Sequence, residues 1–207
     1  MSLDDIYDAV LDFDEDGISQ LINQELESGT DAKTILNEAL IEALDEVGKC
    51  FTEGTMFVPD MLMAAETMKV GVDVLRPLLT GDNSTNKGTA VIGSVKGDMH
   101  DIGKNLVGMM VEGAGFTVID LGVDVDTETF LNATREHKAK FVLMSALLTT
   151  TMLAMKEAVQ TIKAAEPDLK IVVGGAPVNR EFANTIGADG YSDDAPGAVA
   201  VMRAFVS

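Results

Sequence analysis

One histidine lies between two aspartates in a short loop bounded by glycines. The loop runs from Gly97 to Gly103, and His100 has Asp98 two residues before it and Asp101 directly after it. An imidazole can bind a metal through one ring nitrogen while a carboxylate holds the other, because that hydrogen bond fixes the tautomer and the ring orientation. Glycines at both ends permit a tight turn and the close approach of a bulky ligand. The loop therefore indicates a metal-ligand site, with His100 as the ligand.

Two later segments place small or hydroxyl-bearing residues after apolar runs. Ser145 and Leu147 stand at the end of one run, and Gly174 and Gly175 stand at the end of the next. Short apolar runs bounded in this way are typical of buried strands. Because the carboxyl ends of parallel strands meet at one edge of a sheet, we expect these segments and the histidine loop to surround a single extended ligand.

The second half of the chain has the pattern of a parallel sheet covered by helices, since short apolar runs alternate with amphipathic segments. Five βα units of this kind predict a flavodoxin-like (Rossmann-type), doubly wound α/β domain with a five-stranded parallel sheet. The predicted strands are 89–95, 116–121, 141–145, 171–174 and 190–192. The predicted helices are 103–114, 127–137, 151–165, 180–186 and 195–205.

The first part of the chain, residues 1–82, reads as a four-helix bundle, because apolar residues recur there at helical spacing. Thr30 or Asp31 is expected to cap the third helix. Pro59 suits the first turn of the fourth, which we expect to end at Pro77.

A polar stretch from Thr80 to Gly88 separates the two patterns and contains no apolar residue. A segment without apolar side chains has none to bury in a core, so its composition predicts an exposed connection. We therefore place a linker at 83–88 and a second domain at 89–207.

The composition excludes several classes of function. A net charge of −19 opposes the electrostatic attraction on which nucleic-acid binding depends. Cys50 is the single cysteine, so the chain has neither a disulfide framework nor a cysteine zinc site. No apolar run is long enough to span a membrane, and the N-terminus lacks the basic and apolar regions of a leader peptide. These features predict a soluble, cytoplasmic protein that binds neither nucleic acid nor membrane.

The histidine loop resembles a known motif. Asp98, His100 and Gly103 are spaced as D-x-H-x-x-G, which is similar to the lower-ligand motif of cobalamin-binding domains. The segments at Ser145 and Gly174 look like the S-x-L and G-G elements that accompany it. The resemblance implies that cobalamin binds with its dimethylbenzimidazole buried in the sheet domain, while His100 takes the vacated lower axial position on cobalt.

The same resemblance implies roles for other residues. Ser145 would hydrogen-bond the buried base, the two glycines would leave room for the nucleotide tail, and Thr149 would line the tail pocket. Thr151 stands where the family can have a serine hydroxyl that completes a relay with the aspartate and histidine. The implied cofactor-binding residues of this domain are Gly97, Asp98, Met99, His100, Asp101, Ile102, Gly103, Ser145, Leu147, Thr149, Thr151, Gly174 and Gly175.

A helical bundle joined to such a domain looks like the corrinoid proteins of methyltransferase systems and the matching region of methionine synthase. The stretch 53–59 is similar to the segment by which this cap places an apolar side chain over the methyl face of the corrin. Phe57 is the candidate for that role, with Met61 and Ala64 nearby.

The resemblance implies a methyl carrier and not a catalyst in its own right. Cobalamin as Co(I) would accept a methyl group from a donor-specific methyltransferase, and methyl-Co(III) would pass it to a second methyltransferase whose acceptor is tetrahydrofolate or a thiol. A reductive activase would be a further partner.

Three alternatives share parts of the pattern. The cobalamin subunit of an adenosylcobalamin mutase has the same Asp, His, Ser and Gly elements but generally lacks the bundle. A cobalamin-sensing regulator has a similar cap and sheet but needs a basic DNA-binding module, whereas the first helices here are acidic. A response-regulator receiver would use Asp98 as a phospho-acceptor but lacks a helical cap.

Overall fold

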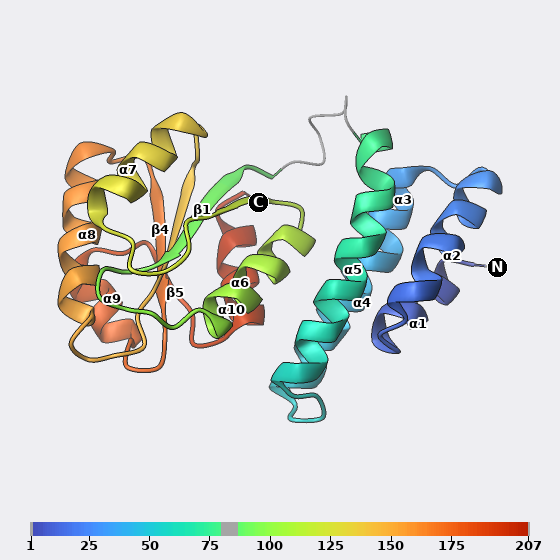
Figure 1. Cartoon of the computed structure of the whole chain (residues 1–207), viewed down its shortest axis with the longest axis horizontal. Helices are drawn as coiled ribbons and strands as arrows, with labels where there is room; N and C mark the ends of the chain where they lie inside the picture. The colour runs from blue at the N-terminus through green and yellow to red at the C-terminus, as the bar shows by residue number, and fades with distance from the viewer. Residues whose placement is uncertain (1, 80–86, 207) are drawn as a thin grey trace. The chain divides into compact units, whose positions relative to one another are not determined.

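The structure is a computed structural model that describes residues 2–79 and 87–206. The chain divides into two compact units, one made of helices and one made of a sheet with its covering helices (Figure 1). The predicted linker at 83–88 falls largely on residues outside the described ranges, so the predicted domain boundaries stay predictions. Within the described residues, no helix is both long and apolar enough to cross a membrane.

Within residues 2–79, the helical unit contains four helical segments, as the apolar spacing predicts. They are α1 (Leu3–Leu11), α2 (Glu15–Glu27), a continuous run of α3 (Ala32–Ile35), η1 (Leu36–Ile41) and α4 (Glu42–Thr52), and α5 (Val58–Leu79). Asp31 caps α3, because its side chain accepts hydrogen bonds from the backbone of Lys33 and Thr34 at 3.0 and 3.1 Å. The middle of the third segment is a π-helix, which helical spacing alone does not predict.

The sheet unit contains five parallel strands in the order β2-β1-β3-β4-β5. They are β1 (Thr89–Ser94), β2 (Thr117–Asp120), β3 (Phe141–Ser145), β4 (Lys170–Gly174) and β5 (Gly190–Tyr191). The chain runs from β1 outward to β2 and then returns to the other side of β1 with β3. The predicted doubly wound sheet is therefore confirmed, with its switch point between β1 and β3.

Among residues 87–206, five helices cover this sheet: α6 (Ile102–Gly113), α7 (Thr127–Glu136), α8 (Met152–Ala165), α9 (Arg180–Ile186) and α10 (Ala195–Ala204). In Figure 1, α7, α8 and α9 lie on one face and α6 and α10 on the other. Buried side chains from the central strands, such as Val142 and Ile171, pack with Phe130 of α7 and Ile162 of α8. Because both faces are covered, the central strands β1, β3 and β4 are buried along most of their length.

The register of the central strands aligns the ends that carry the predicted site. Ser94 pairs with Ser145, and Ser145 pairs with Gly174. The loops after β1, β3 and β4 therefore leave the sheet from one row of residues. The segments that the sequence places at separate strand ends start side by side.

Candidate functional site

The loop after β1 turns back sharply and buries its first aspartate. Gly97 has a φ of +83°, a conformation that glycine adopts without a steric penalty. The backbone N–H of Asp98 donates to Val95 O at 2.9 Å and closes the turn. The Asp98 side chain is 1% exposed, so nearly every atom near its carboxylate belongs to the protein.

The buried carboxylate of Asp98 accepts hydrogen bonds on both oxygens. Oδ1 accepts from the backbone N–H of His100 at 3.1 Å and faces His100 Nδ1 at 2.8 Å. Oδ2 accepts from the backbone N–H of Leu147 and from the Thr151 hydroxyl, both at 2.7 Å. Burial acts to raise the pKa of Asp98, but these hydrogen bonds outweigh it and hold the pKa well below its usual range. Asp98 is therefore an anion that joins the loops after β1 and β3.

The imidazole of His100 is oriented through one nitrogen and open at the other. An ionised carboxylate can only accept, so Nδ1 carries a hydrogen, and in the neutral ring Nε2 then has a free lone pair. The side chain is 49% exposed, and Nε2 has no hydrogen-bond partner among residues 2–79 and 87–206. The carbonyl oxygen of His100 accepts from the buried hydroxyl of Ser94 at 2.5 Å, which also fixes the backbone. This is the arrangement of a metal-ligating histidine with its supporting carboxylate.

The end of β3 contributes an open hydroxyl, and the loop after it contributes hydrogen-bonding groups. Leu147 and Thr151 contact Asp98, whereas Thr149 is exposed. The half-buried hydroxyl of Ser145 has no hydrogen-bond partner in the described part of the chain, which leaves it free for a ligand. The structure thus brings Asp98, His100 and Thr151 together.

The two glycines at the end of β4 are required by the backbones beside them. A Cβ on Gly175, whose φ is +119°, would overlap the carbonyl oxygen of Ala146. A Cβ on Gly174 would lie 2.7 Å from Ser192 O. Both glycines therefore let neighbouring loops pack closely, a reason that the sequence does not reveal. Their predicted role beside a nucleotide tail stays a prediction.

Large apolar side chains close to His100 in the chain, and in the loop after β3, are exposed. Met99 in the loop and Ile102 at the start of α6 are 68% and 66% exposed. Leu147 and Leu148 after β3 are also exposed, and a Cβ on Gly103 would meet nothing within 4 Å. Soluble proteins rarely leave such a group of large apolar side chains uncovered unless a ligand or a partner binds there.

The donor set fits a metal held in a macrocycle. Among the described residues no group of three or more His, Cys, Asp and Glu side chains could hold a metal ion. His100 offers one nitrogen ligand amid an open apolar surface. That combination fits a planar, largely apolar ring whose metal receives its remaining ligands from the ring itself.

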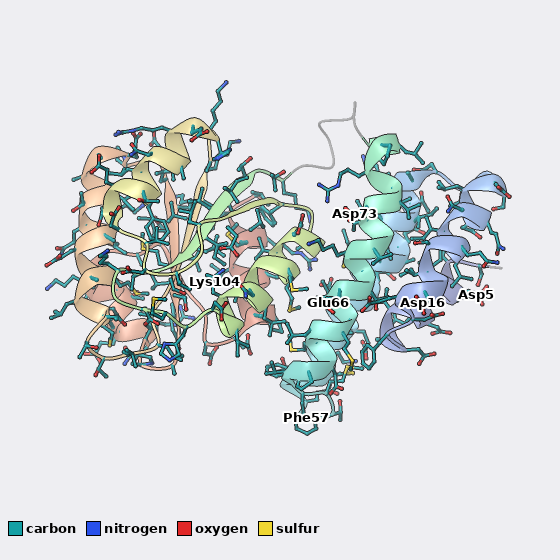
Figure 2. All side chains as sticks on the ribbon, viewed as in Figure 1. Asp5, Asp16, Phe57, Glu66, Asp73 and Lys104 are labelled. Atoms are coloured by element: carbon teal, nitrogen blue, oxygen red, sulfur yellow. The ribbon has the colours of Figure 1, made fainter. Side chains whose placement is uncertain are left out.

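The predicted cap residues belong to the helical unit. Phe57 precedes α5 and is 65% exposed, and its backbone N–H donates to Asp60 Oδ2 at 2.8 Å (Figure 2). Met61 and Ala64 are fully buried. The predicted role of Phe57 and Met61 over the corrin stays a prediction.

Ser94 and Lys104 also support the site, although the sequence does not predict that they do. Ser94 ends an apolar strand, and its polarity at that position is the one signal that it contacts a loop. Lys104, in the first turn of α6 (Figure 2), is 1% exposed at its side chain. Its Nζ donates to both oxygens of Asp120 at 2.6 and 2.5 Å and to Asn105 Oδ1 at 2.6 Å. This ion pair fixes the start of the helix that follows His100.

The chain matches two family models, each described as a B12 binding domain. One covers residues 88–200, and the other covers residues 2–76. The first match spans more than half of the chain and includes every predicted site residue of the sheet unit. The second coincides with the helical unit.

Individual proteins resemble the chain over nearly its whole length. It is 39% identical to trimethylamine corrinoid protein 1 of Methanosarcina acetivorans, over 95% of this chain and 93% of that protein. A crystal structure of a cobalamin-binding protein from Desulfitobacterium hafniense DCB-2 has a TM-score of 0.83 and 30% identity and covers 100% of both chains. The methanol:cobalamin methyltransferase complex MtaBC of Methanosarcina barkeri contains a chain with a TM-score of 0.85 and 31% identity, over 97% of this chain and 78% of that one. The chain therefore belongs to the cobalamin-binding corrinoid proteins of methyltransferase systems, and its cofactor is cobalamin.

Proposed function

We propose that this protein carries a methyl group between two methyltransferases, with His100 as the lower axial ligand of cobalt. The observation that supports it best is the geometry of His100, whose Nδ1 faces the buried Asp98 at 2.8 Å while Nε2 is open. Cobalamin, when bound, supplies the cobalt that holds the methyl group.

Asp98 and Thr151 control the proton of the imidazole in this proposal. With Nδ1 held by an anion, the neutral ring presents its Nε2 lone pair. The Asp98 carboxylate, 2.8 Å from Nδ1, would also stabilise a positive charge on the ring. The Thr151 hydroxyl lies 2.7 Å from Asp98 Oδ2 and 2.8 Å from Leu148 O. A hydroxyl carries a single hydrogen, so these two acceptors share one donor.

The remaining site residues bind the cofactor and exclude water. We assign the planar ring to the apolar surface of Met99 and Ile102, and the displaced base to the open hydroxyl of Ser145. Gly174, Gly175 and Thr149 would border the nucleotide tail. Phe57 and Met61, on a cap of residues 1–82, would shield the face that carries the methyl group.

The proposed partners are a donor-specific methyltransferase, an acceptor methyltransferase that uses tetrahydrofolate or a thiol, and a reductive activase, all in the cytoplasm. Relatives named for trimethylamine and methanol systems make a small methylated compound the first donor to test. Purified protein would be loaded with cobalamin and assayed for methylation by trimethylamine-specific and methanol-specific methyltransferases. If the protein binds cobalamin but neither enzyme methylates it, trimethylamine and methanol are not supported as donors.

The His100 assignment can be tested by electron paramagnetic resonance of the Co(II) form. Protein labelled with nitrogen-15 and loaded with unlabelled cobalamin should give the doublet coupling of a protein nitrogen, whereas retained benzimidazole gives a triplet. His100→Ala should lose the doublet. His137→Ala is the matched control, because His137 is the other histidine of the chain and lies exposed at the end of α7. A triplet in the wild-type protein would refute the assignment.

A further inference from the structure

The loop after β2, residues 121–126, lies against the loop that carries His100. The backbone N–H of Ser94 donates to Gly122 O at 3.0 Å, and that of Val125 donates to Ser94 O at 2.9 Å. Val95 and Val125 form a parallel bridge. The loop after β2 thus continues the sheet beyond β1 and reaches the turn at Gly97.

Asp124 attaches to this turn through both its side chain and its backbone. Its Oδ1 accepts from the backbone N–H of Gly97 at 2.8 Å. Its own N–H donates to Asp98 O at 2.9 Å. The two hydrogen bonds hold opposite sides of the short segment formed by Gly97 and Asp98. They fix where the Asp98 backbone lies and therefore where its carboxylate points.

The residue type suits this double attachment. Asp124 has a φ of 54°, in the left-handed region, which aspartate and asparagine tolerate better than other non-glycine residues. The Gly97 N–H, together with Lys96, holds the pKa of Asp124 below its usual range, so the acceptor is charged. The ion pair with Lys96 joins groups that are 60% and 44% exposed, and such pairs contribute little. The hydrogen bond that Asp124 accepts from Gly97 N–H is therefore the contact that fixes the position of the turn.

Asp98 has little freedom to move without losing its partners. Its carboxylate must reach Leu147 N, the Thr151 hydroxyl and His100 Nδ1 at the same time, and each of these contacts is between 2.7 and 2.8 Å. A ligand histidine depends on supporting residues that hold it to within a fraction of an ångström. A shift of the turn at Gly97 would therefore reach the imidazole.

We propose that Asp124 is a positioning residue that holds Asp98, and through it His100, in the orientation needed to ligate cobalt. The proposal rests on the proposed ligation by His100. Asp124 acts on the metal through two intervening residues, Asp98 and His100, and makes no hydrogen bond to the imidazole.

Three substitutions separate this role from a general effect on folding. Asp124→Asn keeps an acceptor oxygen and a left-handed backbone. Asp124→Gly keeps the left-handed backbone but removes the acceptor. Asp126→Ala is the matched control from the same loop, because Asp126 caps α7 by accepting from Thr129 N at 2.8 Å and takes no part in the turn.

The nitrogen-15 doublet of the Co(II) form is the decisive measurement, made on full-length protein after cobalamin loading. In Asp124→Gly the fraction of cobalt with a protein nitrogen should fall by about two-fold or more, while Asp124→Asn and Asp126→Ala keep the wild-type fraction. In cofactor-free protein, the Gly97 amide should exchange its hydrogen about ten-fold faster in Asp124→Gly and at the wild-type rate in Asp124→Asn.

The outcomes distinguish the two proposals. A wild-type protein without the doublet overturns the ligation by His100. A wild-type doublet that persists undiminished in Asp124→Gly overturns the positioning role alone. If Asp124→Gly fails to fold, the exchange rate of Gly97 in Asp124→Asn still decides, since fast exchange there contradicts the assigned hydrogen bond.

Discussion

At the scale of single residues, the site depends on one buried anion. Asp98 is surrounded by donors and orients His100, yet it cannot itself reach solvent because its side chain is 1% exposed. A buried carboxylate is stable only when its hydrogen bonds replace the water it loses. Asp98 therefore links the stability of the sheet unit to the geometry of the proposed ligand.

Asp98→Asn should destabilise the cofactor-free protein in a pH-dependent way. An amide NH₂ must replace one carboxylate oxygen and would face the N–H of Leu147 or that of His100, at a cost of about 1–3 kcal/mol. The folded-state pKa of Asp98 is lowered, so its stabilising contribution is present above the unfolded-state value of about 3.9 and declines as the pH falls below it. Urea unfolding of both proteins at a series of pH values should show a gap that is constant near neutrality and narrows in acid. A gap that widens in acid would contradict the charge assignment.

At the scale of elements, the sequence predicts what depends on local patterns. The five strands and their helices follow from apolar periodicity, and α7, α8 and α9 begin or end within a residue or so of their predicted limits. The π-helix at Leu36–Ile41 is missed, because its apolar residues continue the spacing of the helix around it. Such a local change in hydrogen bonding leaves no mark in the periodicity.

For the site, too, the sequence predicts the residues whose places follow from local patterns. The positions of His100 and Ser145 follow from their places at strand ends, since the strand register sets where loops begin. The contributions of Ser94, Lys104 and Asp124 are not predictable, because each contacts residues that only the folded chain brings close. Lys104, for example, pairs with Asp120 on another element. Residues that support a site leave weaker sequence patterns than those that form it.

The close approach of the loops after β3 and β4 gives a prediction at this scale. Gly175→Ala should lower the free energy of unfolding on the order of 3 kcal/mol, because the new Cβ would collide with Ala146 O and the backbone is left-handed. Gly187→Ala is the control, since Gly187 has a φ of +84° but a Cβ there would meet nothing within 4 Å, and it should cost about 1 kcal/mol. Thermal and urea unfolding measure both. Equal losses would show that the backbone angle, and not the contact, requires glycine at 175.

At the scale of the whole molecule, a methyl carrier must present one cofactor to more than one enzyme. The proposed shielding of the methyl group by the cap conflicts with access by those enzymes. The conflict is resolved if the cap moves as a unit when a partner binds. The polar sequence between Thr80 and Gly88 has the composition of a connection that permits such movement.

Shortening this connection should separate binding from turnover. A deletion of three residues from within 81–86 should leave cobalamin affinity and the nitrogen-15 doublet unchanged, because neither depends on movement of the cap. Methyl transfer between the two partner enzymes should slow, since the cap could no longer clear the cofactor. A second variant, in which the same residues are replaced by glycine and serine at the original length, should keep wild-type turnover, because such linkers stay flexible. Loss of cobalamin binding in the shortened protein would instead assign the connection a structural role, and full turnover in it would mean that transfer does not require the cap to swing on this segment.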